Sequence, residues 1–100
     1  IFGPVASVIK WSKFEEALSI ANDTSFGLAA GIWTKDISKA LSAAHKLEAG
    51  FVQVNQYIVY RPSLQFGGFK NSGIGNEASL KSMLEGFTKE KTVIINMSSV

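Results

Sequence analysis

The segment Gln65–Glu77 reads QFGGFKNSGIGNE, with four glycines within nine positions and a helix-like pattern directly after it. Glycine adopts positive φ at little cost and lets another group approach the backbone closely. Four glycines so close together therefore predict a folded loop with an unusual path, built against another part of the protein. The glycines expected to shape this loop are Gly67, Gly68, Gly73 and Gly75.

On both sides of this loop the chain alternates between strand-like and helix-like segments. Apolar residues at helical spacing predict helices over residues 14–21, 37–44 and 80–87. Runs of β-branched or small apolar residues predict strands over residues 5–11, 27–34, 51–55 and 91–97. This alternation is typical of the α/β class, and we expect a partly parallel sheet with flanking helices.

The ends of the predicted helices carry recognisable signals. Ser12 and Glu15 have the spacing of a capping box at the start of the first helix. Residues 22–24 have the composition of a turn that closes it. Gly50 is expected to end the second helix, and Asn76 is expected to cap the third.

A long irregular segment, residues 56–75, separates the third predicted strand from the third helix. Loops of this length are uncommon in compact domains and are usually functional. In open α/β sheets, ligands bind beyond the carboxyl ends of the strands, which is where this loop begins. Its aromatic residues could either anchor the loop or line an apolar pocket. They are Tyr57, Tyr60, Phe66 and Phe69.

Composition limits the possible functions. The 100 residues are 46% hydrophobic and only 18% charged, which indicates a surface partly covered by more protein. The net charge of +2 argues against a nucleic-acid partner, and no apolar run is long enough to cross a bilayer. The start at Ile1 has neither an initiator Met nor a signal peptide, so we expect a piece of a longer, cytoplasmic protein.

Catalytic and metal-binding motifs are weak in this sequence. It has no cysteine, and its one histidine, His45, has no second ligand nearby, so no metal site is expected. Residues 73–78 fit Gly-x-Gly-x-x-Ala but lack the preceding strand of a dinucleotide fingerprint, and Lys70 does not stand in a Walker A motif. Ser7 and Lys10 have the spacing of a nucleophile pair but lie in a predicted strand, which favours a structural role.

Separate motifs stand in order along essentially the whole chain. They are Phe2-Gly3-Pro4, Asn22-Asp23-Thr24 with the following residues 26–36, Val54-Asn55, residues 66–77 and Lys91-Thr92-Val93. Together they resemble the C-terminal portion of the NAD(P)-dependent aldehyde dehydrogenases. The resemblance implies that the α/β chain is a fragment of that family's three-layer catalytic domain.

This resemblance implies an oxidoreductase that oxidises an aldehyde to a carboxylic acid with NAD or NADP. In the family a cysteine thiolate attacks the aldehyde, hydride passes to the nicotinamide, and a glutamate activates water. These groups and most cofactor-binding residues would lie outside this chain, so the 100 residues alone are expected to hold no catalytic residue and to be inactive. The implied partners are the aldehyde, the remainder of the enzyme and further copies in a homo-oligomer.

The resemblance also assigns roles to individual residues. Phe2 would pack beside the nicotinamide, while Phe66, Tyr60 and Tyr57 would line the aldehyde tunnel. An oligomerisation strand would include Lys91, Thr92, Val93, Ile94 and Ile95. Residues 1–88 would then belong to the catalytic domain, and residues 89–100 would form the oligomerisation strand and tail. The family usually has proline before Phe-Gly-Gly, whereas this chain has Gln65, which leaves the substrate open.

Two alternatives remain at this point. One is a non-catalytic α/β interaction module or truncated paralogue that associates through exposed apolar faces and the edge strand 91–97. The other is a different nucleotide-dependent oxidoreductase with the same architecture.

Overall fold

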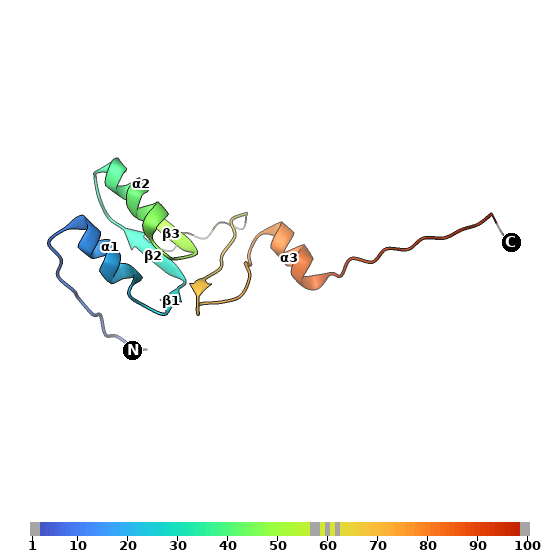
Figure 1. Cartoon of the computed structure of the whole chain (residues 1–100), viewed down its shortest axis with the longest axis horizontal. Helices are drawn as coiled ribbons and strands as arrows, with labels where there is room; N and C mark the ends of the chain where they lie inside the picture. Colours follow the sequence, from blue (N-terminus) through green and yellow to red (C-terminus); the bar gives the residue numbers. More distant parts are fainter. Residues whose placement is uncertain (1–2, 57–58, 60, 62, 99–100) are drawn as a thin grey trace.

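The computed structural model describes residues 3–56, 59, 61 and 63–98. They form α1 (Phe14–Asn22), β1 (Phe26–Gly27), β2 (Ala29–Ile32), α2 (Ile37–Lys46), β3 (Phe51–Val54), β4 (Phe69–Lys70) and α3 (Leu80–Phe87). The molecule measures 78 × 32 × 22 Å because α3 and the residues after it extend away from the remainder (Figure 1). We call residues 12–56 the body, residues 65–77 the glycine-rich loop and residues 78–98 the arm.

The body is organised around a β–α–β unit. Strands β2 and β3 pair in parallel, with Ala29 opposite Phe51 and Ile32 opposite Val54. Helix α2 connects the two strands, and α1 lies on the other side of β2 in Figure 1. The predicted α/β class with a partly parallel sheet and flanking helices is therefore confirmed.

A second pair of strands attaches the glycine-rich loop to the body. Strands β1 and β4 are antiparallel, with Phe26 opposite Lys70 and Gly27 opposite Phe69. Two residues on each side make a weak pairing by backbone hydrogen bonds alone. Side-chain contacts around this pair must therefore hold the loop in place.

The apolar core of the described residues is small. Its buried members are Leu18 of α1 and Ala40 and Ala43 of α2. The predicted apolar stripe of α2 is wrong in detail, because Ile37 and Leu41 are 68% and 55% exposed. The alanine face packs toward β2 and β3 instead, since small side chains let a helix lie close to a sheet.

Three of the predicted helix-end signals are wrong in detail. In α1 it is Glu16, not Glu15, whose carboxylate accepts hydrogen bonds from the backbone N–H and the hydroxyl of Ser12, at 2.9 and 2.8 Å. Helix α2 ends at Lys46, well before Gly50. Helix α3 is capped by Ser79, whose hydroxyl accepts from the backbone N–H of Ser82 at 3.1 Å, and not by Asn76.

Two predicted strands do not form within the chain. Residues 5–11 and 91–97 have β-branched sequences but no strand partner among the described residues. Residues 91–97 instead run outward as an extended segment at the end of the arm (Figure 1). A strand needs a neighbouring backbone to receive its hydrogen bonds, so β-branched sequence is not sufficient.

Candidate functional site

The glycine-rich loop is closed at its base by one backbone pair. The N–H of Phe66 donates to the carbonyl of Glu77 at 2.8 Å, and the N–H of Glu77 donates back to Phe66 at 2.7 Å. The half-buried Phe66 ring meets the Phe51 ring of β3 edge to face, with centroids 5.3 Å apart and an interplanar angle of 68°. Phe66 therefore lies on the rim of the body and not in a closed core.

Close backbone packing brings this loop against the residues before β3. A Cβ on Gly50 would overlap the carbonyl oxygen of Gly67, so only glycine fits at position 50 without moving the loop. Within the loop, Gly75 has φ of 83°, a left-handed conformation that disfavours other residues. The path of the loop thus depends on glycine for two different physical reasons.

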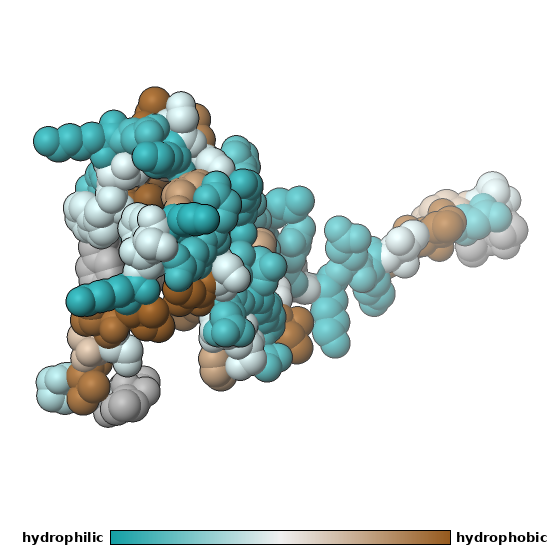
Figure 2. All heavy atoms as spheres, turned by 60° about the vertical axis from the view of Figure 1, so that its left-hand side comes forward, coloured by the Kyte–Doolittle hydropathy of each residue, from teal (hydrophilic) through white to brown (hydrophobic). Residues whose placement is uncertain are grey.

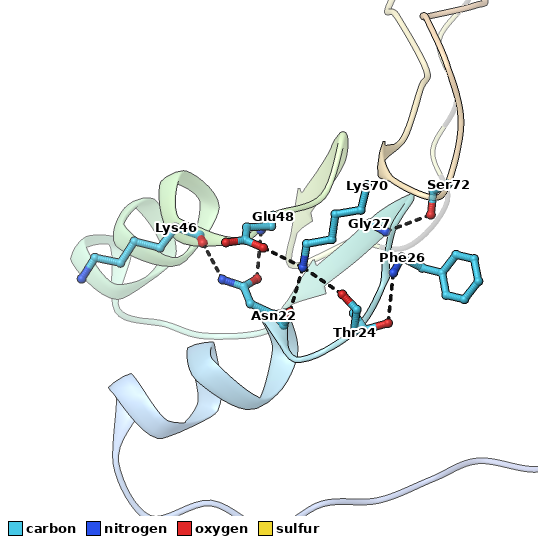
Figure 3. Close-up of polar contacts among 8 residues, drawn as sticks. All are labelled: Asn22, Thr24, Phe26, Gly27, Lys46, Glu48, Lys70 and Ser72. Carbon is cyan, nitrogen blue, oxygen red and sulfur yellow. Dashed lines mark hydrogen bonds and ion pairs between the residues drawn. The ribbon is translucent and has the colours of Figure 1, made fainter.

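Lys70 lies at the centre of a cluster that we call the Lys70 clasp, made of Lys70, Asn22, Thr24 and Glu48 (Figure 3). The Lys70 ammonium donates to the carbonyl oxygens of Asn22 at 2.7 Å and Thr24 at 3.0 Å. It also lies 2.6 Å from the Glu48 carboxylate. Asn22 is the last residue of α1, and a cation there satisfies a helix-end carbonyl and interacts favourably with the helix dipole.

The side chain of Asn22 extends the same network to the residues after α2 (Figure 3). Its Nδ2 donates to the Lys46 carbonyl, and its Oδ1 accepts from the Glu48 N–H, both at 2.9 Å. On the other side of the clasp, the Ser72 hydroxyl accepts from the Gly27 N–H at 2.8 Å. The end of α1, the α2–β3 connection and the glycine-rich loop are therefore joined at one place.

An open hollow runs beside β3 and the start of the long loop. Its volume is about 340 Å³, and its lining includes Phe51, Gln53, Val59 and Arg61. Gln53 is only 7% exposed, and its Nε2 donates to the Val59 carbonyl at 3.3 Å, which holds the loop over the strand. Phe51 thus contacts both this hollow and the Phe66 ring.

The carboxyl ends of β2 and β3 are joined by Asn55. Its Oδ1 accepts from the Thr34 N–H at 2.9 Å, and its Nδ2 donates to the Thr34 carbonyl at 2.8 Å. Asn55 has φ of 54°, which turns the chain out of the sheet into the long loop. The start of the long loop is thereby fixed at the carboxyl-end edge of the sheet, where the sequence predicts ligand binding.

The structure brings together only part of the predicted site. Phe2, Tyr57 and Tyr60 lie outside the described residues. Phe66 meets Phe51, whereas the predicted oligomerisation residues Lys91–Ile95 lie in the arm, away from the loop (Figure 1). Within the described ranges no three His, Cys, Asp or Glu side chains gather as metal ligands, and no helix has the length and apolarity to cross a membrane.

The two carboxylates with lowered pKa serve helix starts. The backbone N–H of Ser12 lowers the pKa of Glu16, and the backbone N–H of Lys39 lowers the pKa of Asp36. Each hydrogen bond favours the charged form of its acceptor. These shifts follow from capping of α1 and α2 and give no candidate for acid–base chemistry.

Sequence reasoning missed the Lys70 clasp. The sequence predicts a turn at Asn22, excludes a Walker A role for Lys70 and places both residues in motifs of the resemblance, but it indicates no contact between them. A usable signal did exist, because a lysine enclosed between glycine pairs stands where the backbone comes close to other segments. The partner Glu48 could not be found without the fold, since it lies 22 residues away in sequence.

The sequence profile of the aldehyde dehydrogenase family matches residues 1–93. The chain is 46% identical over 99 residues to fluoroacetaldehyde dehydrogenase of Streptantibioticus cattleyicolor, covering 99% of this chain and 19% of that protein. It is 44% identical over 98 residues to aldehyde dehydrogenase 1A1 of Mesocricetus auratus, again covering 19% of the relative. This chain belongs to the aldehyde dehydrogenase family and spans about a fifth of the length of these curated relatives.

Solved structures agree with this assignment. Indole-3-acetaldehyde dehydrogenase AldA of P. syringae, solved with NAD+ and IAA, superposes with a TM-score of 0.82 at 49% identity. That match covers 88% of this chain and 18% of AldA. The aldehyde dehydrogenase KauB of Pseudomonas aeruginosa gives the same TM-score at 50% identity, with the same coverage.

Proposed function

We propose that this chain forms part of the catalytic domain of an NAD(P)-dependent aldehyde dehydrogenase, an oxidoreductase that converts an aldehyde to a carboxylic acid. The observation that carries the proposal is the match to AldA, which combines 49% identity with a TM-score of 0.82 over most of the chain. AldA is described in complex with NAD+, which supports NAD or NADP as the cofactor.

In this proposal the chain contributes to substrate and cofactor binding and supplies no nucleophile. The attack on the aldehyde needs a cysteine thiolate, and the 100 residues contain no cysteine. Phe66 would line the aldehyde tunnel together with Tyr60 and Tyr57, and Phe2 would pack beside the nicotinamide. The place of Phe66 on the rim of the body, in contact with Phe51 beside an open hollow, supports the tunnel role.

The arm would provide the oligomerisation strand. Residues 1–88 would belong to the catalytic domain and residues 89–100 to the strand and tail. Val93, Ile94 and Ile95 are 63%, 91% and 72% exposed, and their backbone, which pairs with no strand of the described residues, could add to a sheet of a second copy. The resulting enzyme would be a cytoplasmic homo-oligomer.

A chimera tests the proposed function. Residues 1–100 replace the matching segment of P. syringae AldA, and NADH formation from indole-3-acetaldehyde is measured beside unmodified AldA. We expect the chimera to form NADH and the isolated 100-residue chain to form none. Phe66→Ala in the chimera should raise the KM for the aldehyde about tenfold, because loss of an aromatic contact is worth roughly 1.4 kcal/mol.

Two results would contradict the proposal. One is a folded, soluble chimera that forms no NADH, and the other is NAD reduction by the isolated chain. The first result would favour the second candidate function, a non-catalytic interaction module. The exposed apolar side chains of the arm support this alternative.

A further inference from the structure

We propose that Lys70 is a positioning residue that sets the path of the glycine-rich loop and thereby the place of the Phe66 ring. Its consequence for an aldehyde rests on the proposed function, whereas the positioning itself concerns only contacts within this chain. Lys70 is no candidate for contact with reacting atoms, because its ammonium is engaged by backbone carbonyls and Glu48.

The number of N–H donors on the Lys70 ammonium equals the number of acceptor oxygens around it. Lysine has three N–H donors and no acceptor, and the clasp offers three oxygens, from Asn22, Thr24 and Glu48. The Lys70 side chain is 24% exposed, so water competes only partly for these donors. Its backbone has φ of 52°, a left-handed conformation that bends the chain at this residue. Removing the charge would leave two carbonyls and one carboxylate without this donor.

The clasp acts at the far side of the loop from Phe66. The base of the loop is held by the Phe66–Glu77 backbone pair, and the other side is held by the clasp and by the Ser72–Gly27 hydrogen bond. Lys70 nevertheless lies only four positions after Phe66 along the chain. The β1–β4 pair between them and the body is two residues long, so the backbone alone fixes this side weakly.

Loss of the clasp should therefore move the loop without unfolding the β–α–β unit. That unit is held by the β2–β3 pairing and by the packing of α2. The Phe66 ring would then turn or shift against Phe51, because the chain on one side of it is held only by the two-residue β1–β4 pair and the hydrogen bonds beside it. In a complete enzyme this movement of the Phe66 ring would change the width of the aldehyde tunnel. It would therefore affect aldehyde binding more than cofactor binding.

Two-dimensional NMR of the 100-residue chain tests the positioning. Lys70→Met removes the charge at similar length, Lys70→Arg keeps it in a planar group, and Lys81→Met is the matched control. Lys81 belongs to the arm and pairs with Glu85 on the surface of α3 at 3.7 Å. The readouts are the Phe66–Phe51 ring NOE, the amide shifts of the loop glycines and the amide shifts of β2 and β3.

Lys70→Met should lose at least half of the Phe66–Phe51 NOE intensity and shift the signals of Gly67 and Gly68, while those of β2 and β3 stay in place. Lys70→Arg should restore part of the NOE, and Lys81→Met should change none of these signals. An unchanged NOE in Lys70→Met would overturn the proposal. So would equal loss of the β2, β3 and loop signals without rescue by arginine, because that pattern describes a general stability role.

Kinetics of the AldA chimera give a second, separate readout. Lys70→Met should raise the KM for the aldehyde at least fivefold while the KM for NAD and kcat change less than twofold. A uniform fall of kcat with an unchanged KM would contradict the positioning of the tunnel. A chimera without any activity would contradict the proposed function, and the NMR result would then still decide the role of Lys70.

Discussion

The body and the arm have similar apolar sequence patterns but very different degrees of burial. Helix α2 of the body buries Ala40 and Ala43 almost completely against the parallel strands. Helix α3 of the arm has an apolar stripe as well, yet Leu80 and Phe87 are 72% and 88% exposed. Figure 2 shows hydrophobic surface at the far end of the arm as well as on the body.

The difference separates the formation of a helix or strand from the burial of its apolar face. The body's strands and helix α2 are neighbours in sequence, so a short crossover brings β2 and β3 together. The arm has local helix signals, including the Ser79 cap, but α3 (Leu80–Phe87) has no buried residue. Local sequence is thus enough to form a helix, while burial of its apolar face needs a surface from elsewhere.

The largest expected effect comes from Gly50 in the body. Gly50→Ala should lower the free energy of unfolding by about 3 kcal/mol, because the new Cβ would overlap the backbone of Gly67 and overpacking of this kind is costly. Urea unfolding followed by tryptophan fluorescence measures the change.

The matched substitution in the arm is Gly86→Ala. A Cβ on Gly86 would meet no atom within 4 Å, and alanine favours helix by about 1 kcal/mol over glycine. It should raise the helical circular dichroism signal and leave unfolding of the body unchanged. Equal effects of both substitutions on body unfolding would remove the distinction between body and arm.

Asn22→Ala should have a smaller effect on body stability than Gly50→Ala. Asn22→Ala removes the hydrogen bonds to the Lys46 carbonyl and the Glu48 N–H, so it should destabilise the body by about 1–2 kcal/mol. The control is Asn71→Ala, because among the described residues Asn71 forms a hydrogen bond only through its backbone N–H, to Ser25. If both variants unfold at the same urea concentration, the Asn22 contacts contribute nothing to the body.

The smallest expected effect is a pH dependence at the start of α2. The Lys39 N–H holds the pKa of Asp36 below its ordinary value of 3.8, so the charged cap stabilises the folded chain above that value. This stabilisation is lost as the pH falls through the lowered pKa. Asp36→Asn should therefore reduce the acid sensitivity of α2, measured by its amide shifts. A carboxyl titration of Asp36 at or above 3.8 would contradict this account.

The sequence predicted the fold class and the three helices because periodic apolar spacing and alternating elements are local properties. It placed β2 and β3 correctly within a few residues, but the predicted run 27–34 divides into β1 and β2 of two different sheets, and β4 forms within the predicted irregular segment 56–75. The prediction of strands at residues 5–11 and 91–97 was wrong. β-Branched residues favour the extended conformation, but they cannot supply the partner strand.

The candidate site could be predicted only in part. Clustered glycines indicate a close-packed loop, and the resemblance drew attention to Phe66. The Lys70 clasp depends on backbone carbonyls of Asn22 and Thr24, whose positions no side-chain pattern encodes. The contact of Phe66 with Phe51 likewise follows from the register of β3 beside the loop and not from either residue type.

Hydrogen exchange of the monomeric 100-residue chain tests the contrast between body and arm most directly. Peptides that cover β2 and β3 should exchange slowly, and residues 88–97 should exchange as fast as an unfolded peptide. Protection of residues 88–97 should appear only when the chain assembles. Protection of that segment in the monomer, equal to that of β3, would contradict the account.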